Sequence, residues 1–362
     1  MKPYSNTRAT LAMAKASFRS IIRSPSAVVF SLAFPLIFIV VFGLIGGGGM
    51  RMDVGVSSKS DTLNPVYLSM KSMQVIKLIH HTDKELMEDL IKGRIDAIIN
   101  IQRNNSVPTY TVNAQYSEAS GEKGGILKSI LSNLIAPLNN NSLPVKPTVA
   151  EIKETIIKGR EYKTIDFILP GQLGFSLLSS GVFGTAFVFL SLRLTLVIKR
   201  FFATPVKRSS IVLGEALARI VFSLIGALFI ILIGHFVFGF TLIHGVFTVL
   251  QMLFLSVIGL IVFMGFGFVV SGIAKNESTI PPIANMITLP QFLLSGTFFS
   301  IDVFPTWLQP ISRALPLTFL NDAMRKIAFE GASLWDVHHQ ILILFIWGIG
   351  VYAVAVKTFK WE

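Results

Sequence analysis

The sequence VFTVLQMLFLSVIGLIVFMGFGFVVSG, residues 246–272, contains no charged side chain. The hydrocarbon core of a bilayer is about 30 Å thick, and a helix needs roughly 20 consecutive apolar residues to cross it. This run therefore predicts a transmembrane helix. Comparable runs bring the predicted spans to six: Ser26–Gly46, Leu169–Leu192, Val212–Leu242, Val246–Gly272, Ile280–Ser300 and Gln340–Val356. Glu215 and Arg219 interrupt the start of the third run, so we expect its membrane part to begin near Ile220.

The composition is that of a membrane protein. Of the 362 residues, 52% are apolar and only 14% are charged, and the mean hydropathy is +0.65. A protein of this composition has a largely apolar surface, which needs lipid around it. The chain has no cysteine, which excludes disulfides and thiol redox chemistry. We predict a polytopic α-helical membrane protein with six transmembrane helices and a small α/β extracytoplasmic domain inserted between helices 1 and 2.

The net charge of +12 is distributed in a way that predicts orientation. Basic residues without acids precede the first span and follow the second, whereas the insert between these spans mixes both signs. Because cytoplasmic loops carry the excess of lysine and arginine, both termini and the second connection are predicted in the cytoplasm and the insert outside. The expected location is the bacterial inner membrane, and no nucleic-acid partner is expected.

Residues 1–25 are predicted to form a cytoplasmic interfacial (elbow) helix. Leu11, Ala14, Phe18 and Ile22 recur at helical spacing beside a stripe of lysine and arginine. The alternative is a basic flank that only fixes the topology, and the sequence leaves both open. The apolar run at 26–46 is longer than the roughly 7–15 residues of a signal peptide, so we expect an uncleaved transmembrane anchor.

The insert, residues 47–165, has the pattern of a small α/β domain. Alternation predicts four strands: Asp53–Ser57, Gln74–Ile79, Ile95–Ile101 and Thr109–Val112. A helix is expected from Thr82 or Asp83 to a stop at Gly93. A further helix is predicted at Glu151–Arg160, leading back to the membrane.

Several kinds of chemical site are not indicated. The chain has no GxxxxGK[ST] sequence, so it is not expected to bind ATP through a P-loop. The pairs His80-His81 and His338-His339 lack the spacing of a metal site, and no metal is predicted. His235 lies within a span and is interpreted as a side chain satisfied by a neighbouring helix. The span interiors are almost free of charge, so transport driven by ions is not expected.

Small residues recur in the second predicted span, at Gly174, Ser176, Ser180, Gly181 and Gly184. Small residues three or four apart allow helices to approach closely in lipid. Packing within the chain and contact between subunits both explain the pattern, and the two remain open.

Two segments carry a family resemblance. In KRFFATPVKRSSIVLGEALAR, Lys199–Arg219, a basic pair, Ala-Thr-Pro, a second basic pair and Gly-Glu precede a span. The other is LSGTFFSIDVFPTWLQPISRALPLTFLNDAMRKIAFEG, Leu294–Gly331. Together with Asp53–Ile101, they resemble the permease subunits of type-2 ATP-binding-cassette (ABC) exporters, in the subgroup with a large domain between the first two spans. The resemblance covers nearly the whole chain.

The resemblance implies a permease that is not an enzyme and contains no cofactor. Cytoplasmic ABC ATPase subunits would bind the ATP and Mg²⁺, and a second permease copy would complete a homodimer or heterodimer. A loop at 193–210 would couple to the ATPase through a short basic helix, with Phe201, Phe202 and Pro205 as anchors. The alternative is a solvated basic loop, although the aromatic pair is unnecessary for topology. The predicted coupling residues are Lys199, Arg200, Phe201, Phe202, Thr204, Pro205, Lys207, Arg208 and Glu215. Glu215 would pair with Arg219 as an i,i+4 couple or contact the elbow helix.

The resemblance also implies an outer re-entrant segment at 296–335 that caps the translocation path. Non-helical backbone at membrane depth is tolerated only where protein covers it. Asp322 and Arg325 have the spacing of an i,i+3 pair that would stabilise this cap. The predicted cap residues are Gly296, Phe298, Phe299, Pro305, Trp307, Pro316, Asp322 and Arg325.

The sequence therefore favours the permease subunit of an ATP-driven exporter. An apolar, uncharged path offers little to ions or sugars, so the expected substrate is amphipathic or lipid-like: a drug, a lipid or a secondary metabolite. One alternative is a membrane sensor with an extracytoplasmic α/β domain, which would need a cytoplasmic output domain. The other is a lipid-modifying enzyme, which would need clustered polar catalytic groups.

Overall fold

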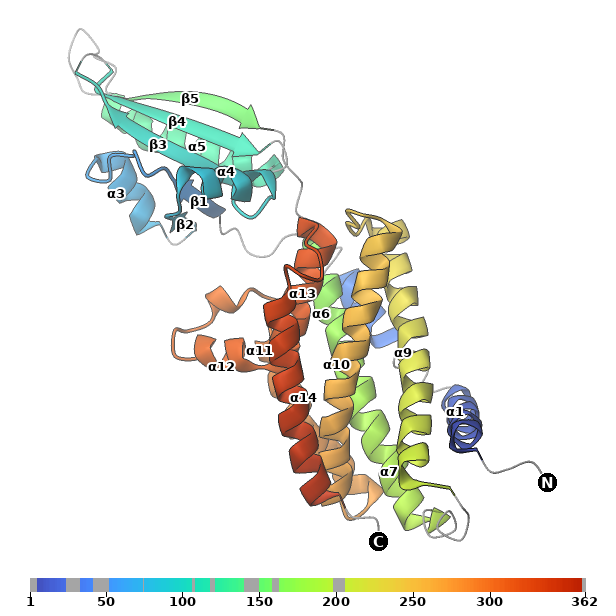
Figure 1. Cartoon of the computed structure of the whole chain (residues 1–362). Helices are drawn as coiled ribbons and strands as arrows, with labels where there is room; N and C mark the ends of the chain where they lie inside the picture. Colours follow the sequence, from blue (N-terminus) through green and yellow to red (C-terminus); the bar gives the residue numbers. More distant parts are fainter. Residues whose placement is uncertain are drawn as a thin grey trace. The chain divides into compact units, whose positions relative to one another are not determined.

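The structure is a computed structural model that describes residues 5–23, 33–41, 52–73, 75–105, 108–117, 121–139, 150–157, 163–197 and 206–359. The chain divides into two compact units (Figure 1). The sheet unit is Gly47–Lys163, and the helical unit combines Met1–Gly46 with Thr164–Glu362.

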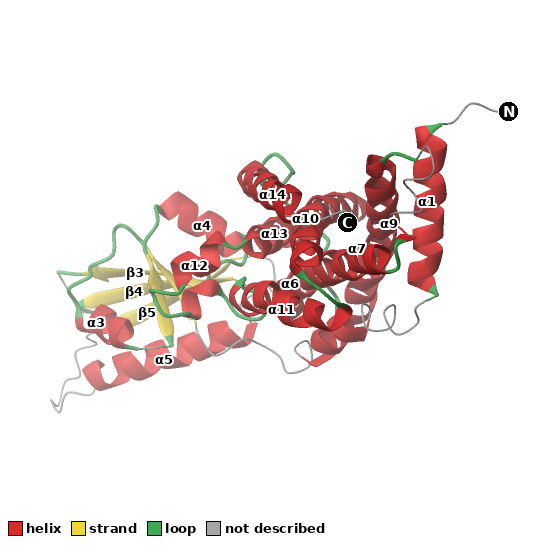
Figure 2. Ribbon diagram, turned by 90° about the horizontal axis from the view of Figure 1, so that it is seen from below, coloured by secondary structure: helices red, strands yellow, loops and turns green. Residues whose placement is uncertain are grey.

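The sheet unit contains a five-stranded sheet in the order β2-β1-β3-β4-β5. The strands are β1 Met52–Val56, β2 Ile76–Ile79, β3 Ala97–Arg103, β4 Tyr110–Ser117 and β5 Ala150–Ile157. β1 runs parallel to both β2 and β3, β3 is antiparallel to β4, and β4 is parallel to β5. The helices of this unit are α3 Pro65–Ser72, α4 Asp83–Ile91 and α5 Gly121–Asn139, and Figure 2 distinguishes them from the strands.

Side chains on the two faces of the sheet form two cores, because successive residues of a strand point in opposite directions. On one face, Val54 and Val112 pack in one cluster with Leu127 of α5. On the other face, Ile98 packs with Leu86 and Leu90 of α4. Helices therefore cover both faces.

Helix α4 begins and ends at the residues that the sequence indicated. Thr82 and Glu85 form a reciprocal capping box at its start, and Gly93 adopts a φ of 68° just after its end. The Ser57 hydroxyl (2.9 Å) and the Ser58 N–H (3.0 Å) donate hydrogen bonds to Asp83, and these donors lower the pKa of its carboxyl group.

The helix predicted at Glu151–Arg160 is wrong, because residues 150–157 form strand β5. This strand pairs with β4 along its length, from Tyr110 opposite Ala150 to Ser117 opposite Ile157. It lies at the edge of the sheet, and most of its side chains are exposed. Long-range pairing decided the conformation here, whereas the local sequence pattern did not reveal it.

The helical unit contains long helices and several short segments. Helix α1, Asn6–Ile22, precedes a helical stretch at 33–41. The second-span segment consists of α6 Thr164–Ser179, the π-helix η2 Ser180–Gly184 and α7 Thr185–Leu194. The remaining elements are α9 Arg208–Phe238, α10 Val246–Ile273, η3 Glu277–Thr279, α11 Ile280–Leu294, η4 Ile301–Val303, α12 Gln309–Ala314, α13 Pro316–Arg325, the π-helix η5 Lys326–Glu330 and α14 His338–Thr358.

Among the described residues, 4 helical segments are long and apolar enough to cross a membrane. They are Thr164–Leu194, Arg208–Phe238, Val246–Ile273 and His338–Thr358. They correspond to the second, third, fourth and sixth predicted spans. α11, in the fifth, has 15 residues and so a length of only about 22 Å. Of the first predicted span, only residues 33–41 are described.

Glycines allow close packing in the helical unit. A Cβ atom added at Gly181 would lie 2.7 Å from Cβ of Phe263, and one at Gly267 would lie 2.7 Å from the Gly181 carbonyl oxygen, so the second-span segment and α10 touch through small residues. The small-residue pattern thus serves packing within the chain. Helix α1 crosses α9 at Gly214, where an added Cβ would lie 2.5 Å from Cβ of Met13 (Figures 1 and 2).

Candidate functional site

The predicted coupling loop is only partly described. Lys199, Arg200, Phe201, Phe202, Thr204 and Pro205 lie outside the described residues. Lys207 and Arg208 are exposed at the start of α9, with Lys207 as its N-cap residue. Helix α9 therefore continues directly from this loop into the helical unit.

A buried ion pair lies two turns into α9. The Nη2 atom of Arg219 is 2.7 Å from Oε1 of Glu215, and these side chains are only 6% and 4% exposed. The i,i+4 pair that the spacing suggested is present. A charge removed from water is tolerated when it is paired with an opposite charge and also hydrogen-bonded. Glu215 provides the opposite charge.

Main-chain carbonyls of the second-span segment accept further hydrogen bonds from Arg219. Arg219 donates to the Gly184 carbonyl at 2.9 Å and to the Ser180 carbonyl at 3.3 Å. These two residues are the ends of π-helix η2, in which the usual i→i−4 hydrogen-bonding pattern is replaced by a wider turn. A Cβ atom at Gly184 would lie 1.7 Å from Nη1 of Arg219, so glycine is required for this approach. The start of α9 is thereby bound to the interior of the second-span segment.

A second link joins the ends of α7 and α10. Arg193, near the end of α7, donates to the Ala274 carbonyl at 2.6 Å, just beyond α10. A cation at a helix C-terminus satisfies an orphan carbonyl and the helix dipole. Two arginines therefore join neighbouring helical segments here: Arg219 joins α9 to η2, and Arg193 joins α7 to the end of α10.

At the predicted cap, Arg325 at the end of α13 binds the start of α6. Its Nε and Nη2 atoms donate to the Phe167 carbonyl at 3.1 and 3.0 Å, and its guanidinium lies 3.7 Å from the centre of the Phe167 ring. Nη2 also donates to the carbonyl of Gly296, which has a φ of 67°. One side chain thus ties α13, α6 and the turn after α11 together.

The predicted pair of Asp322 with Arg325 is wrong. Asp322 forms an ion pair with Lys326 at 2.9 Å and accepts a hydrogen bond from Gln340 at 2.7 Å, while Arg325 is engaged by carbonyls. The spacing placed these side chains near each other along the helix, but α14 and α6 supplied competing partners.

The other predicted cap residues have diverse surroundings. Phe298 lies 4.8 Å from the ring of Phe292 and 5.3 Å from that of Phe38. Phe299 is exposed, and Trp307 is 71% exposed. Pro305 accepts from the Leu308 N–H in the turn before α12, and Pro316 is buried in the first turn of α13. Phe298 is therefore the cap residue that joins the aromatic cluster of the helical unit.

Sequence reasoning missed Asn321. Its Nδ2 donates to the Ser295 carbonyl at 3.2 Å, and a Cβ atom at Gly174 would lie 2.3 Å from its Oδ1. Gly174 was part of the predicted small-residue pattern, but only the structure identifies Asn321 as the side chain packed against it. Asn321 lies within the predicted cap, but the full burial of its amide is visible only in the structure.

No group of three metal-binding side chains occurs within the residues that the structure describes. His235 contacts the Phe240 carbonyl at 2.8 Å, in the turn that follows α9. The ionisable side chains described above bind carbonyls and one another. This arrangement suits mechanical linkage between helices.

Comparison with known proteins identifies a family. The family described as "ABC-2 family transporter protein" matches residues 25–357. The chain is 25% identical over 377 residues to "ABC transporter G family member 20" of Dictyostelium discoideum, covering 96% of this chain but 50% of that protein. It is 21% identical over 376 residues to "Linearmycin resistance permease protein LnrN" of Bacillus subtilis, covering 94% of this chain and 96% of that protein.

Proposed function

This chain belongs to the ABC-2 family of transporter proteins, and we propose that it is the permease subunit of an exporter for an amphipathic or lipid-like substrate. It is a multi-pass membrane subunit of an ABC transporter, and the family works with ATPase subunits. The chain spans only half the length of the Dictyostelium relative. We assign the binding of ATP and Mg²⁺ to separate cytoplasmic ABC ATPase subunits.

The Arg219 network carries this proposal. The loop at 199–208 would contact the ATPase, and α9 begins at its end. Arg219 joins α9 to both ends of η2, and Arg193 joins α7 to the end of α10. Closure of the ATPase subunits would push α9, and these bonds would pass the displacement to the second-span segment. A π-helix gives that segment a place where its register can change, since it is a local departure from α-helical bonding.

The proposed topology has six spans, both termini in the cytoplasm and the sheet unit outside, in the bacterial inner membrane. Four apolar helices and the charge distribution support it. The first span would contain residues 33–41, and α11 with the re-entrant cap would form the fifth. A second permease copy would complete the path, in a homodimer or heterodimer.

The proposed substrate class follows from the surfaces of the helical unit. Exposed side chains on α11 include Met286, Leu289 and Leu293, and Phe292 belongs to the cluster with Phe175 and Phe298. These apolar side chains would contact the apolar part of an amphipathic substrate. The name of the Bacillus relative refers to a permease protein and to linearmycin resistance, which supports the proposed permease role. The sensor alternative has no comparable support.

The test combines Phe201→Ala with Phe202→Ala. Aromatic anchors in protein interfaces often contribute about 2 kcal/mol or more, so we expect at least a roughly 30-fold loss of ATPase co-purification and loss of export. The matched control is Phe236→Ala with Phe247→Ala, which removes two exposed aromatic side chains from α9 and α10. Membrane levels of both variants should equal those of the unmodified chain. Retention of both the ATPase and export in the loop variant would contradict the coupling role.

A further inference from the structure

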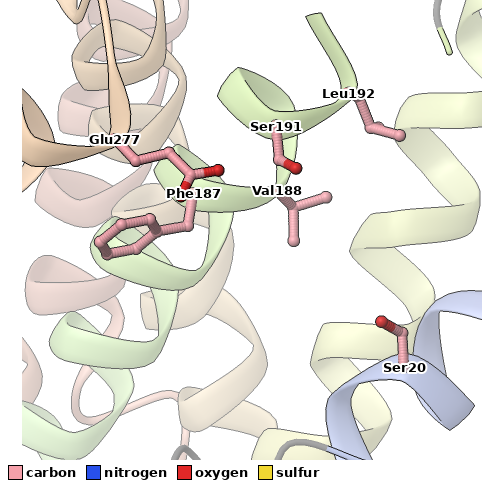
Figure 3. Close-up of a pocket in the computed structure, with 6 residues that line it drawn as sticks. All are labelled: Ser20, Phe187, Val188, Ser191, Leu192 and Glu277. Atoms are coloured by element: carbon pink, nitrogen blue, oxygen red, sulfur yellow. The ribbon is translucent and has the colours of Figure 1, made fainter. Parts of the chain in front are cut away.

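A cavity of about 340 Å³ opens beside α7, between α1 and η3. Its volume is at the lower end of the range of small-molecule sites. Phe187, Val188, Ser191 and Leu192 of α7 form one wall, Ser20 of α1 lies opposite, and Glu277 of η3 closes one side (Figure 3). The cavity therefore combines an apolar wall with three oxygen-bearing side chains.

The carboxylate of Glu277 distinguishes this cavity from an ordinary apolar groove. Glu277 is exposed, and among the described residues its carboxylate has no ion-pair or hydrogen-bond partner. Ser191 also lines the cavity and adds a hydroxyl to it (Figure 3). A primary ammonium donates three hydrogen bonds and carries the complementary charge, so it fits a cavity that offers a carboxylate and a hydroxyl.

The opposite side of the cavity has positive charge nearby. Ser20 lies on α1, and Arg23 is three residues further on, which places both on the same side of that helix. Arg19 and Arg23 are exposed. A hydroxyl and arginines are suitable partners for a phosphate group.

Helix α1 has the pattern of an interfacial helix, so a cavity beside it would lie at the surface of the bilayer. The helix crosses α9, buries Ala14 and exposes its arginines, as an amphipathic helix does when it lies in the interface. The apolar side chains of Val188 and Leu192 would then meet the acyl chains, while the charged groups lie at headgroup level.

We propose that this cavity binds a phospholipid with a primary-amine headgroup, phosphatidylethanolamine. Glu277 and Ser191 receive the ammonium, Ser20 and the α1 arginines receive the phosphate, and the α7 side chains contact the acyl chains. Phosphatidylcholine carries a quaternary ammonium without N–H donors and binds less well. The inference rests on membrane embedding and not on transport, so it is tested without ATP or the ATPase.

The test measures lipid retained by the purified full chain from micelles containing equal amounts of phosphatidylethanolamine and phosphatidylcholine, by native mass spectrometry. We expect about a fivefold preference for phosphatidylethanolamine, the effect of charge-assisted hydrogen bonds that the quaternary ammonium of phosphatidylcholine cannot donate. Glu277→Gln should abolish the preference. Ser191→Leu, which fills the cavity, should lower retention of both lipids. The matched control Glu151→Gln removes an exposed carboxylate in the sheet unit and should retain the preference.

Equal retention of both lipids by the unmodified chain would overturn the proposal, as would a preference that survives Glu277→Gln. A parallel sample contains dodecylamine in place of phospholipid. Glu277-dependent retention of dodecylamine without any preference for phosphatidylethanolamine would instead assign the cavity to a simple amphipathic amine. All variants are first compared in thermal unfolding, so that loss of binding is not confused with loss of folding.

Discussion

Arg219 and Arg325 both bind main-chain carbonyls of the second-span segment, but their charges are compensated differently. Arg219 contacts Glu215 and the carbonyls at both ends of η2, within a nearly fully buried pair. Arg325 contacts the Phe167 and Gly296 carbonyls and lies over the Phe167 ring. In the first region two full charges depend on each other in a buried pair, whereas in the second the described contacts of a partly buried cation are carbonyl dipoles and a π-system. The first region should therefore be far more sensitive to loss of one partner.

The largest loss of stability is expected for Glu215→Ala. It would leave the Arg219 charge buried without its carboxylate, which typically destabilises a protein by about 3–5 kcal/mol. Thermal and denaturant unfolding of the purified chain measure this loss. Glu151→Ala, at an exposed position, should change stability by less than about 0.5 kcal/mol.

A double variant sharpens the same comparison. Glu215→Leu combined with Arg219→Leu removes both charges, so it should destabilise the chain less than Glu215→Ala alone. A single variant as stable as the unmodified chain would show that the pair is not needed to compensate the buried cation.

An intermediate loss of stability is expected for Arg325→Gln. The Phe167 and Gly296 carbonyls would lose charged donors, and hydrogen bonds to charged groups contribute about 1.5–3 kcal/mol. Arg325→Lys should recover part of this loss, since it retains the charge but not the forked geometry. Arg313→Gln is the control, because Arg313 forms an exposed pair with Asp302. Equal unfolding midpoints for Arg325→Gln and Arg313→Gln would contradict the assigned role.

The smallest loss of stability is expected for Asp322→Asn. Its pair with Lys326 is partly exposed, and such pairs contribute at most about 1 kcal/mol, less at high salt. Unfolding in low and high salt would show this dependence. A loss as large as that of Arg325→Gln would contradict the small contribution assigned to the pair of Asp322 with Lys326.

Local sequence patterns predicted much of the fold. The apolar runs correspond to four helices of sufficient length, and Thr82 and Gly93 flank α4 at its observed ends. The local patterns predicted a helix where residues 150–157 form an edge strand, which pairs with β4. Helices α3 and α5 were not predicted, although both contribute to the core of the sheet unit.

The candidate site was predictable only in part. The spacing of Glu215 and Arg219 predicted their ion pair, whereas the same reasoning assigned Asp322 the wrong partner. Neither π-helix had a sequence signal. The coupling role of Phe201 and Phe202 stays a prediction, because these residues lie outside the described part of the chain.

The amino-acid sequence by itself determined that this chain needs a bilayer, where its long apolar helices lie and how its charges are distributed along the chain. These properties depend on hydrophobicity summed over neighbouring residues, and such sums need no knowledge of the fold. Only the tertiary structure decided that Arg219 would bind the carbonyls of η2 and that Arg325 would bind those of Phe167 and Gly296. The physical reason is that a cation partly or fully removed from water binds whichever acceptors packing brings within about 3 Å, and these come from segments far away in the sequence.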